Sequence, residues 1–239
     1  NAYEDDNHFP GIYFQTSFII APDGFVTLRY RRLNSMFAPT PHDIWDKYLE
    51  VYGLDGVFPV AKTEIGNLAC IASEEILYPE IARCLAMRGA EVFCHSSSEV
   101  FGMPNTPKDV AKLARAYENM AYVVSANSAG IADIGIPENS TDGGSKIVDY
   151  KGLVVAETGQ GESMNAFTEI DLAALRRNRR RPGMGNILSR QRFELYAESY
   201  AKHSFYPANS LLNKKPTRAH FVETQKAVIE KLEKDGVIK

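Results

Sequence analysis

Ser73 stands at a place in the chain where a serine could act as a nucleophile. It lies in the stretch "ACIASEEILYPE", where a run of small and apolar residues gives way to a helical pattern. A tight turn between a strand and a helix exposes its residue at the carboxyl edge of a sheet, near the unpaired N–H groups that begin the helix. Such N–H groups can stabilise a developing oxyanion, so the position suits attack on a carbonyl carbon.

A structural role explains the same residue equally simply. Serine is among the best N-cap residues, and Glu75 would add favourable negative charge to the first turn of a helix that begins at Ser73 and ends at Gly89. The local sequence leaves both interpretations of Ser73 open.

The neighbouring sequence predicts the strands and helices that would hold this turn. "VFPVAKTEIGNLACIA", "SEEILYPEIARCLAMRG" and "AEVFCHSS" predict strands, a helix and a strand, which together make a β-α-β unit. A helix capped by Thr106, with Pro107 at its first position, and the strand "AYVVSANSAG" follow. The alternation is typical of a layered α/β sheet.

Further elements are expected on both sides of this unit. "YFQTSFIIAP" and "FVTLRYRRL" flank an Asp–Gly turn and predict a hairpin, and "SKIVDYKGLVVAETG" predicts a second hairpin. We expect a short helix over residues 43–52, between Pro41 and Gly53, and a strand leading into a helix over "FTEIDLAALRRNRRR". From Pro182 the alternation is lost, and the tail continues into the helix "VETQKAVIEKLEKDG".

The composition fits a globular α/β protein and argues against several function classes. Of 239 residues, 44% are hydrophobic and 24% charged, close to the average for globular domains. A net charge of −3 gives no overall field that would attract nucleic acid or anionic lipid. No apolar run reaches the ~18 residues of a membrane span. The three cysteines form no paired motif and fit the reduced thiols of a cytoplasmic protein.

Two kinds of ligand site were considered besides Ser73. The basic run "RRNRRRPGMG", which begins at Arg176, fits a solvated helix end stopped by Pro182 and Gly183, and a phosphate site is the alternative. No His, Cys, Asp or Glu spacing is typical of a metal site, and no glycine-rich phosphate loop is present, so we expect neither metal nor cofactor.

Four stretches in the same order together resemble the nitrilase or carbon–nitrogen hydrolase superfamily. They are "TSFIIAPDGFVTLRYRR", "TEIGNLACIASEEILYPEIAR", "ARAYENMAYVVSANSAG" and "GGSKIVDYKGLVVAETGQGE". The resemblance implies a four-layer α-β-β-α sandwich and the cleavage of amides or nitriles by a Glu, Lys, Cys triad. It places residues 1–181 in a hydrolase-like domain that lacks its N-terminal part, and residues 182–239 in an extension packed on the domain or on a partner subunit.

The same resemblance assigns Ser73 to the position of the catalytic cysteine and Arg32 to that of the lysine. Ser73 lies seven positions after Gly66 and six before Pro79, and both intervals match the family's pattern. The general-base glutamate of the family would precede Asn1. A hydroxyl is a poorer nucleophile than a thiolate, and arginine differs from lysine in reach and stays protonated, so both replacements weaken the expected chemistry.

Other residues match the family's site less directly. The resemblance gives the backbone N–H of Glu74 to the oxyanion and lets Glu118, in "RAYEN", order the site, although a structural carboxylate is the alternative. His42 and Asp43 are the nearest polar candidates for a second glutamate. His95 follows a strand where a loop would border the pocket, and it could be a base for Ser73 or a structural histidine.

These observations leave two functions open. The chain could hydrolyse small amide or nitrile-type compounds through an acyl-enzyme on Ser73, with Arg32 contributing charge. Alternatively, it could be a pseudoenzyme that keeps the pocket as a binding or scaffolding subunit. In both cases the resemblance implies a small amide-like ligand and a homodimer or higher homo-oligomer, and the charge balance argues against a nucleic-acid or membrane partner.

Overall fold

The computed structural model describes residues 2–99, 106–133, 135, 137–138, 141–161 and 163–239. The chain forms two compact units. Unit 1 comprises residues 1–16, 31–57 and 191–239, and unit 2 comprises residues 17–30 and 58–190. The predicted boundary at residue 182 stays a prediction.

Unit 2 is built on a six-stranded mixed sheet with the strand order β4-β5-β6-β7-β8-β9. Its strands are β4 (Ala61–Thr63), β5 (Gly66–Ala72), β6 (Val92–Ser97), β7 (Tyr122–Asn127), β8 (Lys146–Val148) and β9 (Val154–Glu157). The three central strands β5, β6 and β7 run parallel, whereas β4, β8 and β9 pair antiparallel with their neighbours. The carboxyl ends of β5, β6 and β7 therefore meet at one edge of the sheet.

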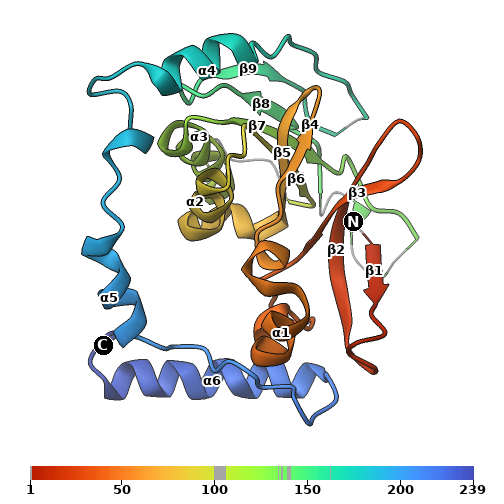
Figure 1. The fold of residues 1–239 in the computed structure, drawn as a ribbon. Coiled ribbons are helices and arrows are strands. Elements are labelled where there is room, and N and C mark those ends of the chain that lie inside the picture. Colours follow the sequence, from red (N-terminus) through yellow and green to blue (C-terminus); the bar gives the residue numbers. More distant parts are fainter. Residues whose placement is uncertain (1, 100–105, 134, 136, 139–140, 162) are drawn as a thin grey trace. The chain divides into compact units, whose positions relative to one another are not determined.

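Two helices supply the crossover connections between the parallel strands. α2 (Pro79–Met87) connects β5 to β6, and α3 (Pro107–Asn119) connects β6 to β7. The two helices pack against each other on the same side of the sheet (Figure 1). As predicted, the Thr106 hydroxyl caps α3 by accepting from the Asp109 N–H at 3.2 Å, and Pro107 takes the first position.

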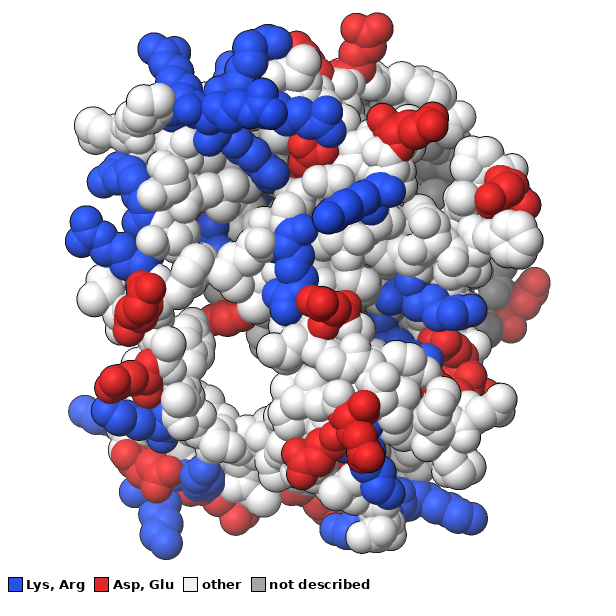
Figure 2. Space-filling model, in the orientation of Figure 1, with Lys and Arg blue, Asp and Glu red and all other residues white. Residues whose placement is uncertain are grey.

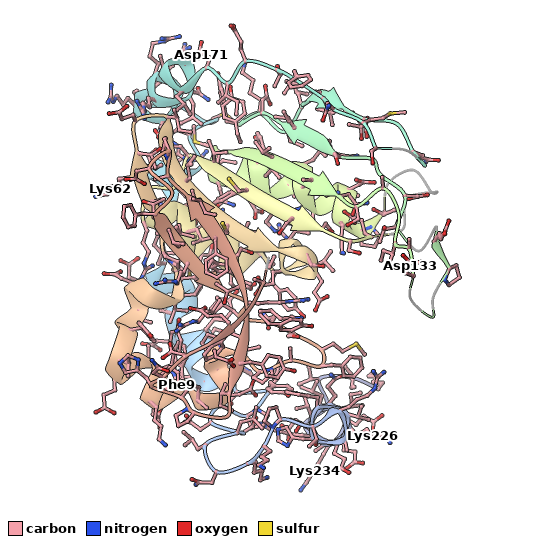
Figure 3. All side chains as sticks on the ribbon, turned by 90° about the vertical axis from the view of Figure 1, so that its right-hand side faces the viewer. Phe9, Lys62, Asp133, Asp171, Lys226 and Lys234 are labelled. Atoms are coloured by element: carbon pink, nitrogen blue, oxygen red, sulfur yellow. The ribbon has the colours of Figure 1, made fainter. Side chains whose placement is uncertain are left out.

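The ends of the sheet can be followed in Figure 3. Asp171, at the start of α4 (Leu172–Arg180), lies beside the amino end of β7, where its N–H donates to the Tyr122 hydroxyl at 3.3 Å. Asp133 lies in the segment beyond the carboxyl end of β7. Leu175 of α4 packs with Val92 and Tyr122 in a buried apolar cluster, so α4 covers the amino end of the sheet.

A second sheet has the strand order β1-β2-β3. Its strands are β1 (Ala2–Asp5), β2 (Tyr13–Ile20) and β3 (Val26–Arg31). The predicted hairpin between β2 and β3 is confirmed: Ala21 N–H donates to the Phe25 carbonyl at 2.8 Å, and Gly24 has φ +86°. The second predicted hairpin is confirmed as β8 and β9, with Gly152 at φ +79° in the turn.

Unit 1 is otherwise helical. It contains the 3₁₀ helix η1 (Pro41–Ile44), α1 (Trp45–Val57), α5 (Glu194–Lys202) and α6 (Arg218–Lys234). Phe9, Phe14 and Tyr48 form an aromatic core with ring centroids about 6 Å apart. No described residue after Gln191 forms a strand, in agreement with the change of pattern in the tail.

Three local predictions are wrong. Pro41 begins η1 rather than the α-helix, and the predicted stop at Gly53 (φ +61°, ψ −175°) is only a kink, because α1 resumes and ends at Val57. The predicted strand before α4 is not formed, since residues 166–171 pair with no strand and Phe167 is 85% exposed. The third concerns Ser73, which is not the N-cap of a single long helix.

Candidate active site

Ser73 forms a strained turn at the carboxyl end of β5. Its φ is +51°, a left-handed conformation that costs a non-glycine residue about 1–2 kcal/mol. The chain then forms the 3₁₀ helix η2 (Ser73–Leu77), whose N-cap is Ala72, and α2 begins only at Pro79. Proline disfavours a helical conformation in the residue before it, and Tyr78 is extended, so a helix cannot run unbroken from Ser73.

A buried carboxylate holds the residue before the turn. The Glu75 side chain is fully buried, and its Oε2 accepts from the Ala72 N–H at 3.2 Å and from the Tyr30 hydroxyl at 2.7 Å. Tyr30 is also fully buried, and it lies at the end of β3. From the sequence we expected Glu75 to add only charge at a helix start, whereas its carboxylate fixes the backbone of the turn and binds Tyr30, which is distant in the sequence.

His95 holds the turn from the neighbouring strand. Its Nε2 lies 2.8 Å from the Ser73 carbonyl oxygen, and its Nδ1 lies 2.8 Å from the Ser125 Oγ. Burial lowers the pKa of His95 from its ordinary value to about 4, although the hydrogen bond to Ser73 opposes this shift. Both ring nitrogens are engaged, and the contact with Ser73 is to its main chain, which favours the structural interpretation of His95 over a base.

The hydroxyl of Ser73 is the free group at this turn. Ser73 is partly buried, and its Oγ makes no hydrogen bond with any residue that the structure describes. A group that is held by its backbone and unengaged at its side chain is available to a ligand. The structure thus has Ser73 in the turn directly after β5 and reveals no base directed at its hydroxyl among the described residues; its catalytic role stays a prediction.

Arg115 and Glu118 brace the segment that follows the turn. The Arg115 guanidinium donates to the Ile76 and Leu77 carbonyls at 3.0 and 3.1 Å, and to the Glu118 carboxylate at 2.9 Å. Glu118 therefore acts on η2 through Arg115 in this structure, which fits an ordering role outside the reacting atoms. The Nη1 of Arg83 is buried and has no partner in the described part of the chain.

Arg32, His42 and Asp43 belong to unit 1. Arg32 donates to the Asn34 carbonyl at 2.8 Å and to the Gln15 Oε1 at 3.0 Å. The buried Asp43 carboxylate accepts from the Thr40 N–H at 2.9 Å and from the Ser210 hydroxyl at 2.7 Å. Asp43 thus acts as the N3 residue of the capping box of η1, whose N-cap is Thr40, and it anchors the C-terminal segment.

His42 is a partly buried ring at the same place. It packs near Trp45 and Tyr206, with centroids 6.0 and 6.4 Å away, and its carbonyl accepts from the Asn209 N–H at 2.9 Å. Burial lowers the pKa of His42, although the charge of Asp43 opposes the shift. The contacts of His42 and Asp43 are those of residues that attach the C-terminal segment, and their pocket role stays a prediction.

A buried network of charges that we did not predict lies beside His95. Lys112 Nζ contacts the Glu99 carboxylate at 2.7 Å and Asp109 at 3.5 Å, and Lys146 Nζ contacts Asp109 and Glu157, each at 2.8 Å. The Lys112 and Lys146 side chains are only 2% and 6% exposed. Buried ammonium groups require such partners. Lys112 at a core-facing helix position and Ser125 inside an apolar strand were the signals available in the sequence.

A small polar pocket opens at the same edge of the sheet. It has a volume of ≈ 220 Å³ and is lined by Asn127, Ala129, Gly143, Ser145, Thr158, Ser163, Met164 and Asn165. Cross-strand pairing places Ala72 opposite Ser96 and Ser96 opposite Ala126, so the Ser73 turn and Asn127 both lie at this edge. Ligands of α/β sheets commonly bind outside the carboxyl ends of parallel strands.

The basic run is partly structural. Figure 2 shows Lys and Arg side chains gathered over α4. Arg176 pairs with Glu91 at 2.6 Å, and Arg179 donates to the Met120 and Ala90 carbonyls at 2.9 and 2.7 Å. Arg177 is 70% exposed at its side chain. Two of these arginines thus attach α4 to the sheet, whereas a solvated helix end was expected.

The described residues offer neither a metal site nor a membrane span. No group of three or more His, Cys, Asp or Glu side chains within the described ranges could hold a metal ion. No helix among the residues described is both long and apolar enough to cross a membrane. Cys70, Cys84 and Cys94 are all free thiols.

Comparison with known proteins adds to this geometry. The family model "Carbon-nitrogen hydrolase" matches residues 2–180. The chain is 29% identical over 187 residues to a nitrilase of Pyrococcus abyssi, covering 77% of this chain and 64% of that protein. It is 31% identical over 178 residues to an (R)-stereoselective amidase of a Pseudomonas species, covering 71% of this chain and 57% of the relative. The chain thus spans less than two thirds of either relative.

A solved structure shows the same fold. The crystal structure of a carbon–nitrogen hydrolase from Helicobacter pylori G27 superimposes with a TM-score of 0.65 at 21% identity, over 84% of this chain and 70% of the other. This likeness confirms the predicted nitrilase-type α/β fold.

Proposed function

Because the chain belongs to the carbon–nitrogen hydrolase family, we propose that it cleaves small amide or nitrile-type compounds through an acyl-enzyme on Ser73. The observation that carries the proposal is the turn itself: Ser73 is held at φ +51° by its backbone, and its hydroxyl has no partner in the described part of the chain. Several relatives carry amidase names, which supports a small amide as substrate.

In the proposed reaction of an amide, the Ser73 Oγ attacks the carbonyl carbon and loses its proton to a base. The oxyanion is stabilised by the backbone N–H of Glu74 and, by family resemblance, by the charge of Arg32. The C–N bond then breaks, the amine leaves with a proton, and water hydrolyses the Ser73 ester to release the acid. Glu118 would order the segment after the turn, and no cofactor takes part in these steps.

Turnover of a substrate panel tests this proposal. The chain is incubated with short aliphatic amides, nitriles and carbamoyl compounds, and release of ammonia or amine is measured. We expect release that Ser73→Ala abolishes and that Ser98→Ala, a change at an exposed serine of the same sheet edge, leaves within about twofold. Equal rates for both variants would assign the activity to a group other than Ser73.

A pseudoenzyme is the second candidate, and one observation favours it. Serine needs a base to become a nucleophile, yet His95 uses both ring nitrogens elsewhere and no described residue forms a hydrogen bond with the Ser73 hydroxyl. A binding subunit would be stabilised by amide ligands without forming product. The double change Ser73→Cys with Arg32→Lys would then create turnover, whereas turnover by the unchanged chain would end this candidate.

We further propose that the chain forms a homodimer or higher homo-oligomer. The outer side of α2 and α3 exposes Met87, Val110 and Tyr117, each about half exposed, and α5 exposes Tyr196 and Tyr200. Apolar surface of this kind is often covered by a second subunit. Sedimentation equilibrium of the chain and of Val110→Lys with Tyr117→Lys tests the first surface. A monomeric unchanged chain would refute the proposal.

The cytoplasmic location also stays a prediction.

A further inference from the structure

A row of polar residues crosses the sheet of unit 2 on one face. Cross-strand pairing places His95 opposite Ser125, Ser125 opposite Lys146, and Lys146 opposite Glu157. Residues directly opposite each other in a sheet project to the same side. His95, Ser125, Lys146 and Glu157 therefore form one row over four adjacent strands, and we call it the polar row.

Helix α3 covers the polar row. α3 packs against β7 and β8, and it directs Asp109 and Lys112 towards the sheet. Asp109 contacts Lys146 at 2.8 Å and Lys112 at 3.5 Å. Only Glu157, at the end of the row, is substantially exposed, with 42% of its side chain accessible. The other members of the row are buried, and their polar groups meet protein partners: Ser125 contacts the His95 ring, and Lys146 contacts Asp109 and Glu157.

These contacts fix the tautomer of His95. The Ser73 carbonyl can only accept a hydrogen bond, so His95 Nε2 must carry the hydrogen at this 2.8 Å contact. A second proton on the ring is opposed by burial and by the charges of Lys112 and Lys108, and is favoured by the hydrogen bond to Ser73 and by the charge of Glu99. The bare Nδ1 then accepts from the Ser125 hydroxyl at 2.8 Å. His95 is thus neutral and points its one N–H at the turn.

The Ser73 turn is held from both sides. Glu75 fixes the Ala72 N–H, and His95 fixes the Ser73 carbonyl. We infer that His95 is a positioning residue: it holds Ser73 in its left-handed conformation through the main chain, and the Ser125 hydroxyl supports the required Nε2–H tautomer by donating to the bare Nδ1. The inference rests on the proposed function only in taking the Ser73 hydroxyl as the reacting group.

Three variants separate positioning from simple packing. His95→Gln keeps a donor that can reach the Ser73 carbonyl, His95→Phe keeps a ring of similar size without any donor, and Ser125→Ala removes the partner of Nδ1. We measure the rate at which a small amide acylates Ser73, by mass spectrometry. The Phe variant should lose about 100-fold, as expected for a misplaced reacting atom. The Gln variant should stay within about tenfold of the unchanged chain. Equal losses for Gln and Phe would overturn the inference.

Two further measurements do not depend on turnover. Long-range ¹H–¹⁵N spectra of the His95 ring at pH 7 should show the neutral Nε2–H tautomer, with a shift towards a tautomer mixture in Ser125→Ala. Hydrogen exchange of the amides at 72–78 should rise about tenfold or more in His95→Phe and stay near the original rate in His95→Gln. Amides of α2 serve as the control and should change little.

These measurements test the proposed reaction at Ser73 and the positioning role of His95 separately. If the unchanged chain is never acylated at Ser73, the proposed function fails, yet the ring spectra and the exchange rates still decide the role of His95. An Nδ1–H tautomer, or unchanged exchange at 72–78 in a folded His95→Phe variant, would refute the positioning role even if Ser73 proved reactive.

Discussion

The Ser73 turn in unit 2 and the cluster around Arg31 in unit 1 both bury polar groups, but they leave different groups free. In the Arg31 cluster, the guanidinium contacts Glu4 at 3.0 Å and Asp6 at 2.5 Å, and it lies over the rings of Phe14 and Tyr52 with its carbon 4.7 and 4.6 Å from their centroids. Each carboxylate has further donors: the Thr16 hydroxyl for Glu4, and His8 with Tyr52 for Asp6.

At the Ser73 turn, the main chain and the supporting side chains are satisfied in the same way, whereas the Ser73 hydroxyl has no partner in the described part of the chain. Buried polar groups thus have two different roles in this chain. In the Arg31 cluster every named group is used within the cluster, which fits a role in stability. At the turn, buried side chains hold one strained residue by its backbone and leave its hydroxyl available to a ligand. This arrangement fits a binding or catalytic site.

The largest expected effect is the loss of the cation from the Arg31 cluster. Arg31→Met leaves Glu4 and Asp6 buried without their common partner, and breaking a buried ion pair of this kind costs about 3–5 kcal/mol. The free energy of unfolding in urea measures the loss. Lys62→Met, at an exposed strand position, is the matched control and should change stability by less than about 0.5 kcal/mol. A small effect of Arg31→Met would show that the cluster is not a stabilising centre.

Acidification should act on the turn through His95. Burial lowers the pKa of this group from 6.5 to about 4, so below pH 6.5 the unfolded chain takes up a proton that the folded chain does not bind. The contribution of neutral His95 to the free energy of unfolding is therefore complete above pH 6.5. About 3 kcal/mol of this contribution is lost as the pH falls to 4. Subtracting the curve of His95→Gln isolates this contribution. A flat difference between pH 7.5 and 4 would contradict a buried neutral imidazole.

A single hydrogen bond of the Arg31 cluster should have a smaller effect. The Tyr52 hydroxyl donates to the Asp6 carboxylate and helps hold the pKa of Asp6 at about 2, although burial of Asp6 opposes this shift. Tyr52→Phe should cost about 1.5 kcal/mol at pH 7. It should also raise the pKa of Asp6, which a titration of the carboxyl carbon by NMR can follow. An unchanged pKa would remove Tyr52 from the cluster.

The smallest expected effect has the opposite sign. Ser73→Gly relieves the left-handed conformation at φ +51° but adds backbone entropy to the unfolded chain, so stability should rise by roughly 0.5 kcal/mol while the reactive hydroxyl is lost. Ser98→Gly, where φ is not positive, is the control and should be destabilising. A loss of stability in Ser73→Gly would mean that the turn is not strained.

Local patterns were enough to predict much of the fold. Strand-helix-strand alternation gave β5, α2, β6, α3 and β7, and the Thr106 cap and both hairpins followed from residues adjacent in the chain. Spacing from Gly66 and Pro79 placed Ser73 at the end of β5. The prediction of one long helix capped by Ser73 was wrong because Pro79 restricts Tyr78 to an extended conformation, which separates η2 from α2.

The supporting groups of the site could not be read from adjacent residues. α3 turns Asp109, Lys112 and Arg115 inward beside two alanines and leaves Val110 and Tyr117 exposed, which departs from the usual amphipathic pattern. Which strand faces His95, and hence which hydroxyl meets its Nδ1, depends on the register between β6 and β7. Such pairings are set by tertiary contacts, whereas the sequence shows only that a polar residue interrupts an apolar strand.

The most direct test of the central claim is to trap an acyl group on Ser73. The chain is mixed with a short amide such as propionamide, quenched in acid during turnover, digested and mapped by mass spectrometry, with Ser73→Ala in parallel. The account predicts a propionyl mass increase on the peptide that contains Ser73, absent from the variant. No adduct on Ser73 across the substrate panel, with product still formed, would contradict the claim that this turn presents the nucleophile.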